Sequence, residues 1–236
     1  IKNERKQNIG LWIELLIVSV FLWFIVDNVY VTINNYSKPL GFDTEHTYIM
    51  HLGHLNESSP KYIKDITDEE GVDNILTTLE RIKQNPMIEA ASISHNSSPH
   101  IGSNSSLNIF RDTLQTRGYN LLRRVTPDFF KVFRYESTNG SSDELVQALE
   151  RGEYVISTEI TQELFKEDES PIGKHLSFSN EKDADMFTVG AVSKTVRYDN
   201  FSNWNNYVAQ PMSNHFLSSY PSKWIIYLEY CVRVKP

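Results

Sequence analysis

Residues 9–31 read IGLWIELLIVSVFLWFIVDNVYV, and this apolar stretch indicates whether the first part of the chain lies in a membrane or in water. As a helix, its 23 residues would extend ~34 Å, enough to cross a hydrocarbon core ~30 Å thick. Glu14 and Asp27 lie near its two ends, where a carboxylate can reach water at the headgroups. The uninterrupted apolar run, 15–26, is shorter and leaves the core helix of a soluble protein as an alternative.

Basic residues flank this stretch on one side only. None follows it until Lys38, and those before it are Lys2, Arg5 and Lys6. The asymmetry predicts a cytoplasmic N-terminus and an extracytoplasmic chain after Val31. A cleaved signal peptide fits less well, because the stretch is long and no small-x-small cleavage site follows it. We therefore expect residues 1–34 to comprise a short cytoplasmic start and a retained transmembrane helix.

The composition is typical of a globular protein. The chain has 236 residues, 40% of them hydrophobic and 22% charged, with a net charge of -7. The part after the apolar stretch is long enough for one large domain or two small ones. Basic residues do not cluster beyond Arg123 and Arg124, so we expect no nucleic-acid partner.

The single cysteine, Cys231, excludes a disulfide within the chain. An extracytoplasmic domain of this size without disulfides favours a bacterial envelope over a eukaryotic secretory route. Asn-x-Ser sequons leave a glycosylated eukaryotic ectodomain as the alternative. They begin at Asn35, Asn56, Asn96, Asn104, Asn139 and Asn200.

A strand, a helix and a second strand are predicted in the first part of the domain. Residues 47–52 are rich in strand-forming types. Thr67 and Glu70 have the spacing of a capping box, and apolar residues with helical period follow as far as Asn85–Pro86. Residues 87–94 then predict a strand. The result is a βαβ-like unit whose helix covers one face of a sheet.

The remainder mixes strands and helices without strict alternation, so the predicted class is α+β. Residues 224–234 alternate in polarity, which predicts a half-buried strand with Cys231 on its more polar face. Thr126, Ser142 and Thr158 are the predicted N-caps of three helices. Further strands are expected at 107–110, 119–125, 153–157, 174–179 and 186–192, and helices at 127–133, 143–151 and 158–165.

Several groups of reactive residue types lack the spacing of a known site. The histidines His46, His51 and His54 are joined by no cysteine or spaced carboxylate, so a metal site is not expected. A hydrolase triad would need a Gly-x-Ser-x-Gly elbow, which surrounds no serine here. The residues of suitable type for such a triad are Ser157, His175 and Asp183.

Residues 171–174, Pro-Ile-Gly-Lys, differ from a phosphate-binding loop, which requires Gly-x4-Gly-Lys-Ser/Thr. The acidic run within 163–169 lacks calcium-loop spacing and is interpreted as a solvated helix end. We therefore expect no catalytic residue, no metal and no cofactor.

Two aromatic clusters have different predicted roles. Phe129, Phe130 and Phe133 recur with helical spacing and are expected in the core. Trp204 and Tyr207 lie in or beside an Asn-rich stretch and are predicted to form an exposed contact for a partner.

Short motifs follow one another along the chain after the N-terminal anchor. They are residues 125–133 (VTPDFFKVF), 154–157 (YVIS), 164–165 (LF), 170–174 (SPIGK), 189–192 (VGAV) and 227–234. In this order they resemble the extracytoplasmic core of ABC transporter permeases of the MacB/FtsX type, and residues 40–43 (LGFD) resemble the Bacteroides-type branch. The family-motif residues are expected to have structural roles; they are Thr126, Pro127, Phe129, Phe130, Pro171, Gly173 and Lys174.

The resemblance implies a transmembrane helix followed by a mixed, βαβ-rich periplasmic core domain at 35–236, with a smaller, variable insertion at about 95–118 that includes a surface excursion from 95 to 106. Two departures stand out. Family members often carry a Gly-Arg-x-Phe-like turn after the aromatic helix, where this chain has Arg134. The family also has three further membrane helices after the core, so we expect this sequence to be truncated before them.

The resemblance further implies a location in the bacterial inner membrane, a homodimer or a pairing with a related permease, and a separate ATP-binding subunit. ATP hydrolysis would be transmitted mechanically through the first helix to the periplasmic domain, which would do no chemistry itself and could meet a periplasmic partner protein. The alternatives are a single-span binding or sensor module that regulates a cell-envelope partner, such as a cell-wall hydrolase, and a membrane-anchored enzyme.

Overall fold

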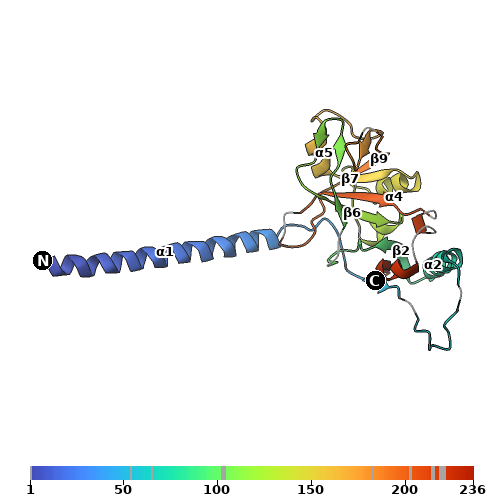
Figure 1. The fold of residues 1–236 in the computed structure, drawn as a ribbon, viewed down its shortest axis with the longest axis horizontal. Coiled ribbons are helices and arrows are strands. Elements are labelled where there is room, and N and C mark those ends of the chain that lie inside the picture. The colour runs from blue at the N-terminus through green and yellow to red at the C-terminus, as the bar shows by residue number, and fades with distance from the viewer. Residues whose placement is uncertain are drawn as a thin grey trace.

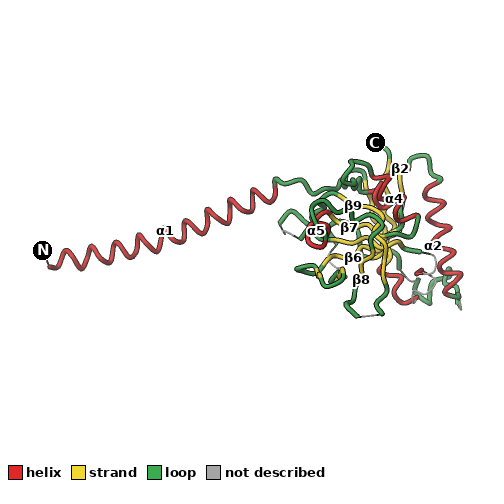
Figure 2. Tube along the Cα trace, turned by 90° about the horizontal axis from the view of Figure 1, so that it is seen from above, coloured by secondary structure: helices red, strands yellow, loops and turns green. Residues whose placement is uncertain are grey.

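A long helix stands away from a sheet-rich domain. A computed structural model describes residues 2–53, 55–64, 66–101, 105–181, 183–201, 204–213, 216–217 and 222–236. Helix α1 (Lys2–Tyr36) projects from one side of the domain, as Figures 1 and 2 show from two directions. Its segment Asn8–Tyr36 is long and apolar enough to cross a membrane, and its most apolar part packs against no other element. The predicted membrane helix therefore extends five residues beyond Val31.

The domain is built on one strongly mixed sheet, so the predicted α+β class is confirmed. The strands are β1 (Thr47–His51), β2 (Ile88–His95), β3 (Ser105–Leu107), β4 (Phe110–Arg111), β5 (Leu114–Gln115), β6 (Asn120–Val125), β7 (Tyr154–Ser157), β8 (His175–Ser177), β9 (Met186–Ser193), β10 (Tyr207–Pro211) and β11 (Leu228–Val234). Their order is β1-β11-β2-β6-β10-β7-β9-β8-β4-β5, with β3 beside β6. The remaining helices are α2 (Asp68–Lys83), α3 (Phe129–Val132), α4 (Ser142–Glu150), α5 (Thr158–Leu164) and the 3-10 helix η1 (Ser222–Tyr227).

The predicted βαβ-like unit is present, but its two strands are separated by a third. β1 and β2 each pair antiparallel with β11, so they are parallel to each other with β11 between them. α2 packs over this part of the sheet through buried Ile75 and Leu79. The capping box of Thr67 and Glu70 forms at its start as predicted. In Figures 1 and 2, α2 lies on the side of the domain away from α1.

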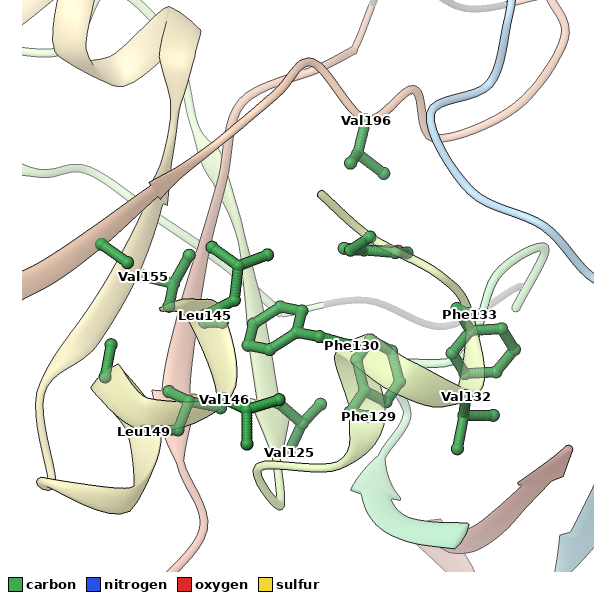
Figure 3. Close-up of a cluster of buried hydrophobic side chains, with 14 of the residues drawn as sticks. Val125, Phe129, Phe130, Val132, Phe133, Leu145, Val146, Leu149, Val155 and Val196 are labelled. Atoms are coloured by element: carbon green, nitrogen blue, oxygen red, sulfur yellow. The ribbon is translucent and has the colours of Figure 1, made fainter. Parts of the chain in front are cut away.

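A second cluster of buried side chains joins α3 and α4 to the middle of the sheet (Figure 3). Phe129, Phe130 and Phe133 are all buried in it, as the sequence predicts. Their rings meet at centroid distances of 6.1 Å and 4.8 Å, within the range of favourable aromatic contacts.

The prediction that the last strand is half-buried is wrong. β11 is buried on both faces because elements cover each of them: Leu228, Tyr230 and Val232 pack in the cluster beneath α2, and Cys231 packs in the cluster that contains α3. Its more polar face is closed by Glu229, Cys231 and Arg233, which are 0%, 0% and 1% exposed. Burial raises the pKa of the Cys231 thiol to about 12, so this thiol stays protonated at neutral pH.

The predicted N-caps are wrong at three helices, since the candidate side chains have other partners. Thr126 binds the backbone of β2, and α3 begins only at Phe129 after Asp128. Thr158 is the first residue of α5, and its hydroxyl donates to the Ser193 carbonyl at 2.7 Å. α4 is capped by Ser141 rather than by Ser142.

The expected surface excursion after β2 is also only partly present. Ser97 and Ser98 are 0% and 2% exposed, because Ser97 bonds the strand β6 through the Arg124 N–H. Ile109, farther along, is fully buried in a third cluster beneath α5. Residues 95–118 thus contribute core side chains as well as loops.

Candidate functional site at the junction of the membrane helix and the domain

The end of α1 is held by an arginine from the far end of the chain. Arg197 lies in the connection between β9 and β10 and is 5% exposed. Its Nη1 donates to the Asn35 carbonyl at 2.7 Å, and its backbone N–H donates to the Leu40 carbonyl at 2.9 Å. The last carbonyls of a helix lack intrahelical partners, and a cation there also meets the negative end of the helix dipole. α1 has no basic residue in its own last turn, so Arg197 provides this charge.

The segment after α1 lies tightly against the same connection. Gly41 has φ of +81°, and a Cβ built on it would lie 2.1 Å from the Thr195 carbonyl oxygen. Only glycine therefore fits at this position. The next residue, Phe42, packs on the core, with its ring 5.4 Å from His100 and 6.2 Å from Tyr135. The chain thus enters the domain through an anchored turn.

Arg233 joins this entry segment to α3 and β11. Its Nη2 donates to the Asp43 carbonyl at 2.7 Å and its Nη1 to the Glu45 carbonyl at 2.9 Å. Its Nε donates to the Val132 carbonyl at 2.6 Å, and Nη1 lies 3.3 Å from the Asp43 carboxylate. A buried guanidinium is tolerated where carbonyls and a carboxylate surround it in this way. The backbone N–H of Asp43 completes the contact by donating to the Phe133 carbonyl at 2.9 Å.

Arg134 replaces the glycine expected in the turn after the aromatic helix. It has φ of +51°, and the Tyr135 N–H donates back to the Phe130 carbonyl at 2.9 Å, as in a Schellman motif. Glycine is the usual residue at this position of the motif. The arginine side chain instead pairs with Asp43 at 3.3 Å and with Glu89 at 3.8 Å. The departure from the family pattern therefore adds an ion pair at the junction.

An open groove of about 1330 Å³ runs beside the junction. Its basic lining residues are Lys38, Arg134, Lys194 and Arg197, and its acidic ones are Asp43 and Glu136. Lys194 pairs with Glu136 at 2.6 Å. The groove lies where α1 meets the domain, so any displacement of the helix alters its walls.

The family-motif residues at 126–130 shape the neighbouring core. The Thr126 hydroxyl accepts from the Ile93 N–H at 2.9 Å and is within 3.4 Å of the Ile93 carbonyl. Pro127 is half-buried in the turn before α3, and Phe129 and Phe130 fill the space beneath that helix. These residues fix α3, whose carbonyl at Val132 binds Arg233.

The second group of family-motif residues lies elsewhere, in the turn before β8. Gly173 has φ of +77°, and its N–H donates to the Val189 carbonyl at 2.8 Å. Pro171 accepts from the Lys174 N–H at 3.1 Å, and the Lys174 ammonium lies 3.8 Å from Glu169. The turn therefore ties the α5 region to β9, and none of its residues lines the junction groove.

The acidic run is only in part the solvated helix end that was predicted: Glu167 and Asp168 are exposed, whereas Glu163 and Glu169 are bonded to other segments. Glu169 accepts a bidentate pair of hydrogen bonds from Arg111, which holds the pKa of this carboxyl below its usual range. Glu163 accepts from the Arg117 N–H at 2.7 Å and from the Asn206 amide at 3.2 Å. Through these hydrogen bonds both carboxylates hold residues 110–117 against α5 and the loop that follows it.

The two residues predicted to contact a partner differ in their exposure. Tyr207 opens β10 and is 1% exposed, so its expected exposure is wrong: the side chain is part of the central core. Trp204 is 38% exposed, and its indole N–H donates to the Tyr119 carbonyl at 2.8 Å. A partner contact at Trp204 stays a prediction.

The residues considered for catalysis and metal binding are not assembled into a site. Ser157 is buried, and its hydroxyl accepts from the Tyr207 N–H at 3.3 Å, whereas His175 is exposed beside Thr188. Within the described part of the chain, no group of three His, Cys, Asp or Glu residues is placed to hold a metal ion. His54 lies outside the described residues.

Sequence reasoning missed the residues that form the junction. Arg197 has no local signal, because its partners Asn35 and Leu40 lie far upstream in the sequence. Gly41 and Arg233 are part of motifs that carry the family resemblance, but the motifs alone do not reveal that both hold the entry segment.

A family model described as the MacB-like periplasmic core domain matches residues 24–236. The chain belongs to this family. The match includes the C-terminal third of α1 together with the whole sheet domain. The chain is therefore a MacB/FtsX-type permease sequence with a MacB-like extracytoplasmic domain, and its described residues include one apolar helix that could span a membrane. The Bacteroides-type branch stays a prediction.

Several solved structures are similar to this MacB-like chain. A domain from Porphyromonas gingivalis described as belonging to a permease protein has 18% identity and a TM-score of 0.47, over 67% of each chain. The periplasmic region of MacB from Actinobacillus actinomycetemcomitans has 12% identity and a TM-score of 0.46, over 85% of this chain and 79% of that one. The extracellular domain of the noncanonic ABC-type transporter YknZ from Gram-positive bacteria has 14% identity and a TM-score of 0.43, over 80% and 84%. None of the curated proteins matches the sequence significantly.

Proposed function

We propose that this chain is part of an ABC transporter permease in which α1 transmits the effect of cytoplasmic ATP hydrolysis to the MacB-like domain. The N-terminus lies in the cytoplasm, and residues 35–236 lie in the periplasm. A separate ATP-binding subunit supplies the energy, and two permease chains act as a homodimer or a related pair. The output is the export of a substrate or a signal across the envelope.

The observation that supports this proposal most directly is the anchoring of α1 to the domain by Arg197. A flexible linker would not transmit the displacement of a helix, because it would absorb the movement. Here the last turn of α1 and Gly41 are bonded or packed to the β9–β10 connection, and Asp43 is bonded to β11. Movement of the helix therefore acts on the β9–β10 connection and, through Arg233, on β11.

In this proposal the periplasmic domain transmits movement and catalyses no reaction. A transporter of this kind needs shape changes in the domain, and these depend on rigid contacts at the junction rather than on reactive side chains.

The test is to purify the complete permease with the ATP-binding subunit encoded beside it and reconstitute both in nanodiscs. Spin labels on Glu57→Cys, in the exposed loop far from α1, report the distance between the two domains of a dimer. We expect this distance to change when ATP is added, and the change to be reduced at least severalfold by Arg197→Ala.

Arg151→Ala is the matched control, because Arg151 is an exposed arginine whose ion pair in the described part of the chain is with nearby Glu153, just after α4. It should leave the ATP-dependent change intact. A complex without any ATP-binding subunit would contradict the proposal and favour a single-span sensor. An ATP response that survives Arg197→Ala unchanged would contradict the role of the junction.

A further inference from the structure

β1 ends the sheet on one side, and half of its backbone groups face outward. Among the described strands it pairs with β11 alone. The His46 carbonyl accepts from the Val234 N–H, and the Leu52 N–H donates to the Leu228 carbonyl. Antiparallel pairing alternates, so the even-numbered residues of β1 direct their backbone groups to β11 and the odd-numbered ones direct theirs away. The outward-facing residues are Thr47, whose N–H already donates to the Thr44 carbonyl at 3.3 Å, Ile49 and His51.

The side chains of β1 do not protect this edge. Sheet edges are normally blocked by lysine or proline, by inward-pointing charges or by being very short. The other end of the sheet follows this rule, since β5 has only two residues. β1 has five residues, TYIMH, with no acidic residue, lysine or proline. Tyr48, Ile49 and Met50 are 60%, 39% and 44% exposed.

A groove of about 430 Å³ runs along β1 on the side covered by α2. Tyr48 and Met50 form one wall, and Ile82 and Arg81 of α2 lie on the other. Arg81 is exposed and makes no ion pair within the described part of the chain. The edge therefore offers a row of hydrogen-bonding groups, an apolar channel and one cation.

We propose that β1 binds an extended peptide segment of another protein by β-strand addition. The segment bonds the outward groups of Ile49 and His51, inserts alternate apolar side chains beside Tyr48 and Met50, and places an acidic group on Arg81. Main-chain hydrogen bonds supply affinity in this mode, and pockets for alternate side chains supply specificity. The inference is independent of ATP coupling.

The choice of a peptide follows from the chemistry of the surface. A lipid has no alternating backbone donors and acceptors to match those of β1. A second copy of this chain could pair through its own β1, but residues 47–51 contain no acidic side chain to meet Arg81. A peptide segment with alternating apolar residues and an acidic group matches the outward backbone groups of β1, the apolar groove and Arg81.

The probe is a fluorescein-labelled heptapeptide library in which apolar residues alternate with threonine before a C-terminal aspartate. Binding to the full chain in nanodiscs is followed by fluorescence anisotropy. Ile49→Pro should weaken the binding of the selected peptides at least tenfold, because proline removes an outward-facing N–H and its ring occupies the edge of the strand. The fold should persist, since proline is tolerated where the N–H of an edge strand faces solvent. Ile49→Val is the matched control and should bind normally.

Two N-methylated forms of the best peptide test the mode on the unaltered chain. Methylation of one alternate set of amides should abolish binding. Methylation of the other set should leave the affinity within a few-fold of that of the unmodified peptide. Arg81→Gln should weaken peptides ending in aspartate but not those ending in asparagine amide. Equal effects of the two methylated forms, no binding from the library, or self-association of the chain that Ile49→Pro abolishes would each overturn the proposal.

Discussion

At the scale of single residues, the junction depends on positions that tolerate little change. Gly41 combines a positive φ with contact to the Thr195 carbonyl, and Arg197 is a buried cation surrounded by carbonyl oxygens. Neither property is visible in the identity of the residue alone. Both come from segments that lie far apart in the sequence and side by side in the fold.

Gly41→Ala should destabilise the protein by about 1–3 kcal/mol, because the alanine Cβ would meet the Thr195 carbonyl oxygen and because φ of +81° is strained for it. Urea unfolding followed by tryptophan fluorescence would measure the loss. Gly118→Ala is the control: a Cβ there meets nothing within 4 Å, and the expected change is within about 0.5 kcal/mol. Equal effects at the two glycines would contradict this account of the junction.

His95 at the end of β2 should make stability depend on pH. Burial, and secondarily the charge of Arg124, lower its pKa from 6.5 to about 4. Between these two pH values the folded protein therefore binds fewer protons than the unfolded chain. The contribution of His95 to the free energy of unfolding is thus fully present above pH 6.5 and is lost as the pH falls toward 4. The difference in urea midpoint between the wild type and His95→Gln should change across this window. A difference that stays constant from pH 7 to pH 4 would contradict the lowered pKa.

At the scale of elements, side chains that hold one element to another matter more than caps within an element. Thr126 illustrates this, because its hydroxyl bonds β2 rather than the helix that follows it. Arg233 similarly joins β11 to α3 and to the entry segment. These bonds fix the position of α3 relative to the sheet.

Thr126→Val should cost about 1–3 kcal/mol, since it leaves the buried Ile93 N–H without its side-chain acceptor. Thr126→Ser keeps the hydroxyl and should lose less than half as much. The free energies of unfolding of the two variants, measured in urea, provide the comparison. If the serine variant were as unstable as the valine variant, packing of the methyl group would be the cause instead.

Elements with a local pattern could be predicted from the sequence, and those defined by distant partners could not. The capping box and helical period of α2 and the aromatic spacing of α3 depend on near neighbours; α2 formed as expected, and the three phenylalanines are buried although α3 begins only at Phe129. β11 was predicted as half-buried because its alternation is local, whereas its burial depends on α2 and α3, which cover its two faces. The junction escaped prediction for the same reason, since Arg197 reaches a helix at the other end of the chain.

At the scale of the whole molecule, α1 and the domain form one mechanical path. The segment Asn8–Tyr36 of this helix carries two carboxylates, Glu14 and Asp27, and both are exposed in a part that packs against no other element of the described chain. Carboxylates near the ends of a membrane span can reach water at the headgroups. Their position is compatible with a helix that shifts relative to the membrane.

Asp27→Leu should leave membrane insertion intact, because it replaces a carboxylate with a residue that favours hydrocarbon. It should reduce the ATP-dependent movement of the domain if the carboxylate holds α1 at the interface. Carbonate extraction of membranes and the Glu57 label distance measure the two properties separately. Loss of insertion would contradict an interfacial position for Asp27.

The position of β11 between β1 and β2 also has a consequence for the synthesis of the protein. The strand is the last in the sequence, yet β1 and β2 both need it as their hydrogen-bonding neighbour. While the chain emerges across the membrane, more than a hundred residues separate β2 from the strand that completes it. Until then β2 lacks its neighbour on one side, and the part of the apolar face of α2 that packs on β11 is uncovered. Contacts between such distant segments form slowly. The nascent domain is thus most open to proteases and to aggregation until its last strand arrives, and folding assistance outside the membrane would act in that interval.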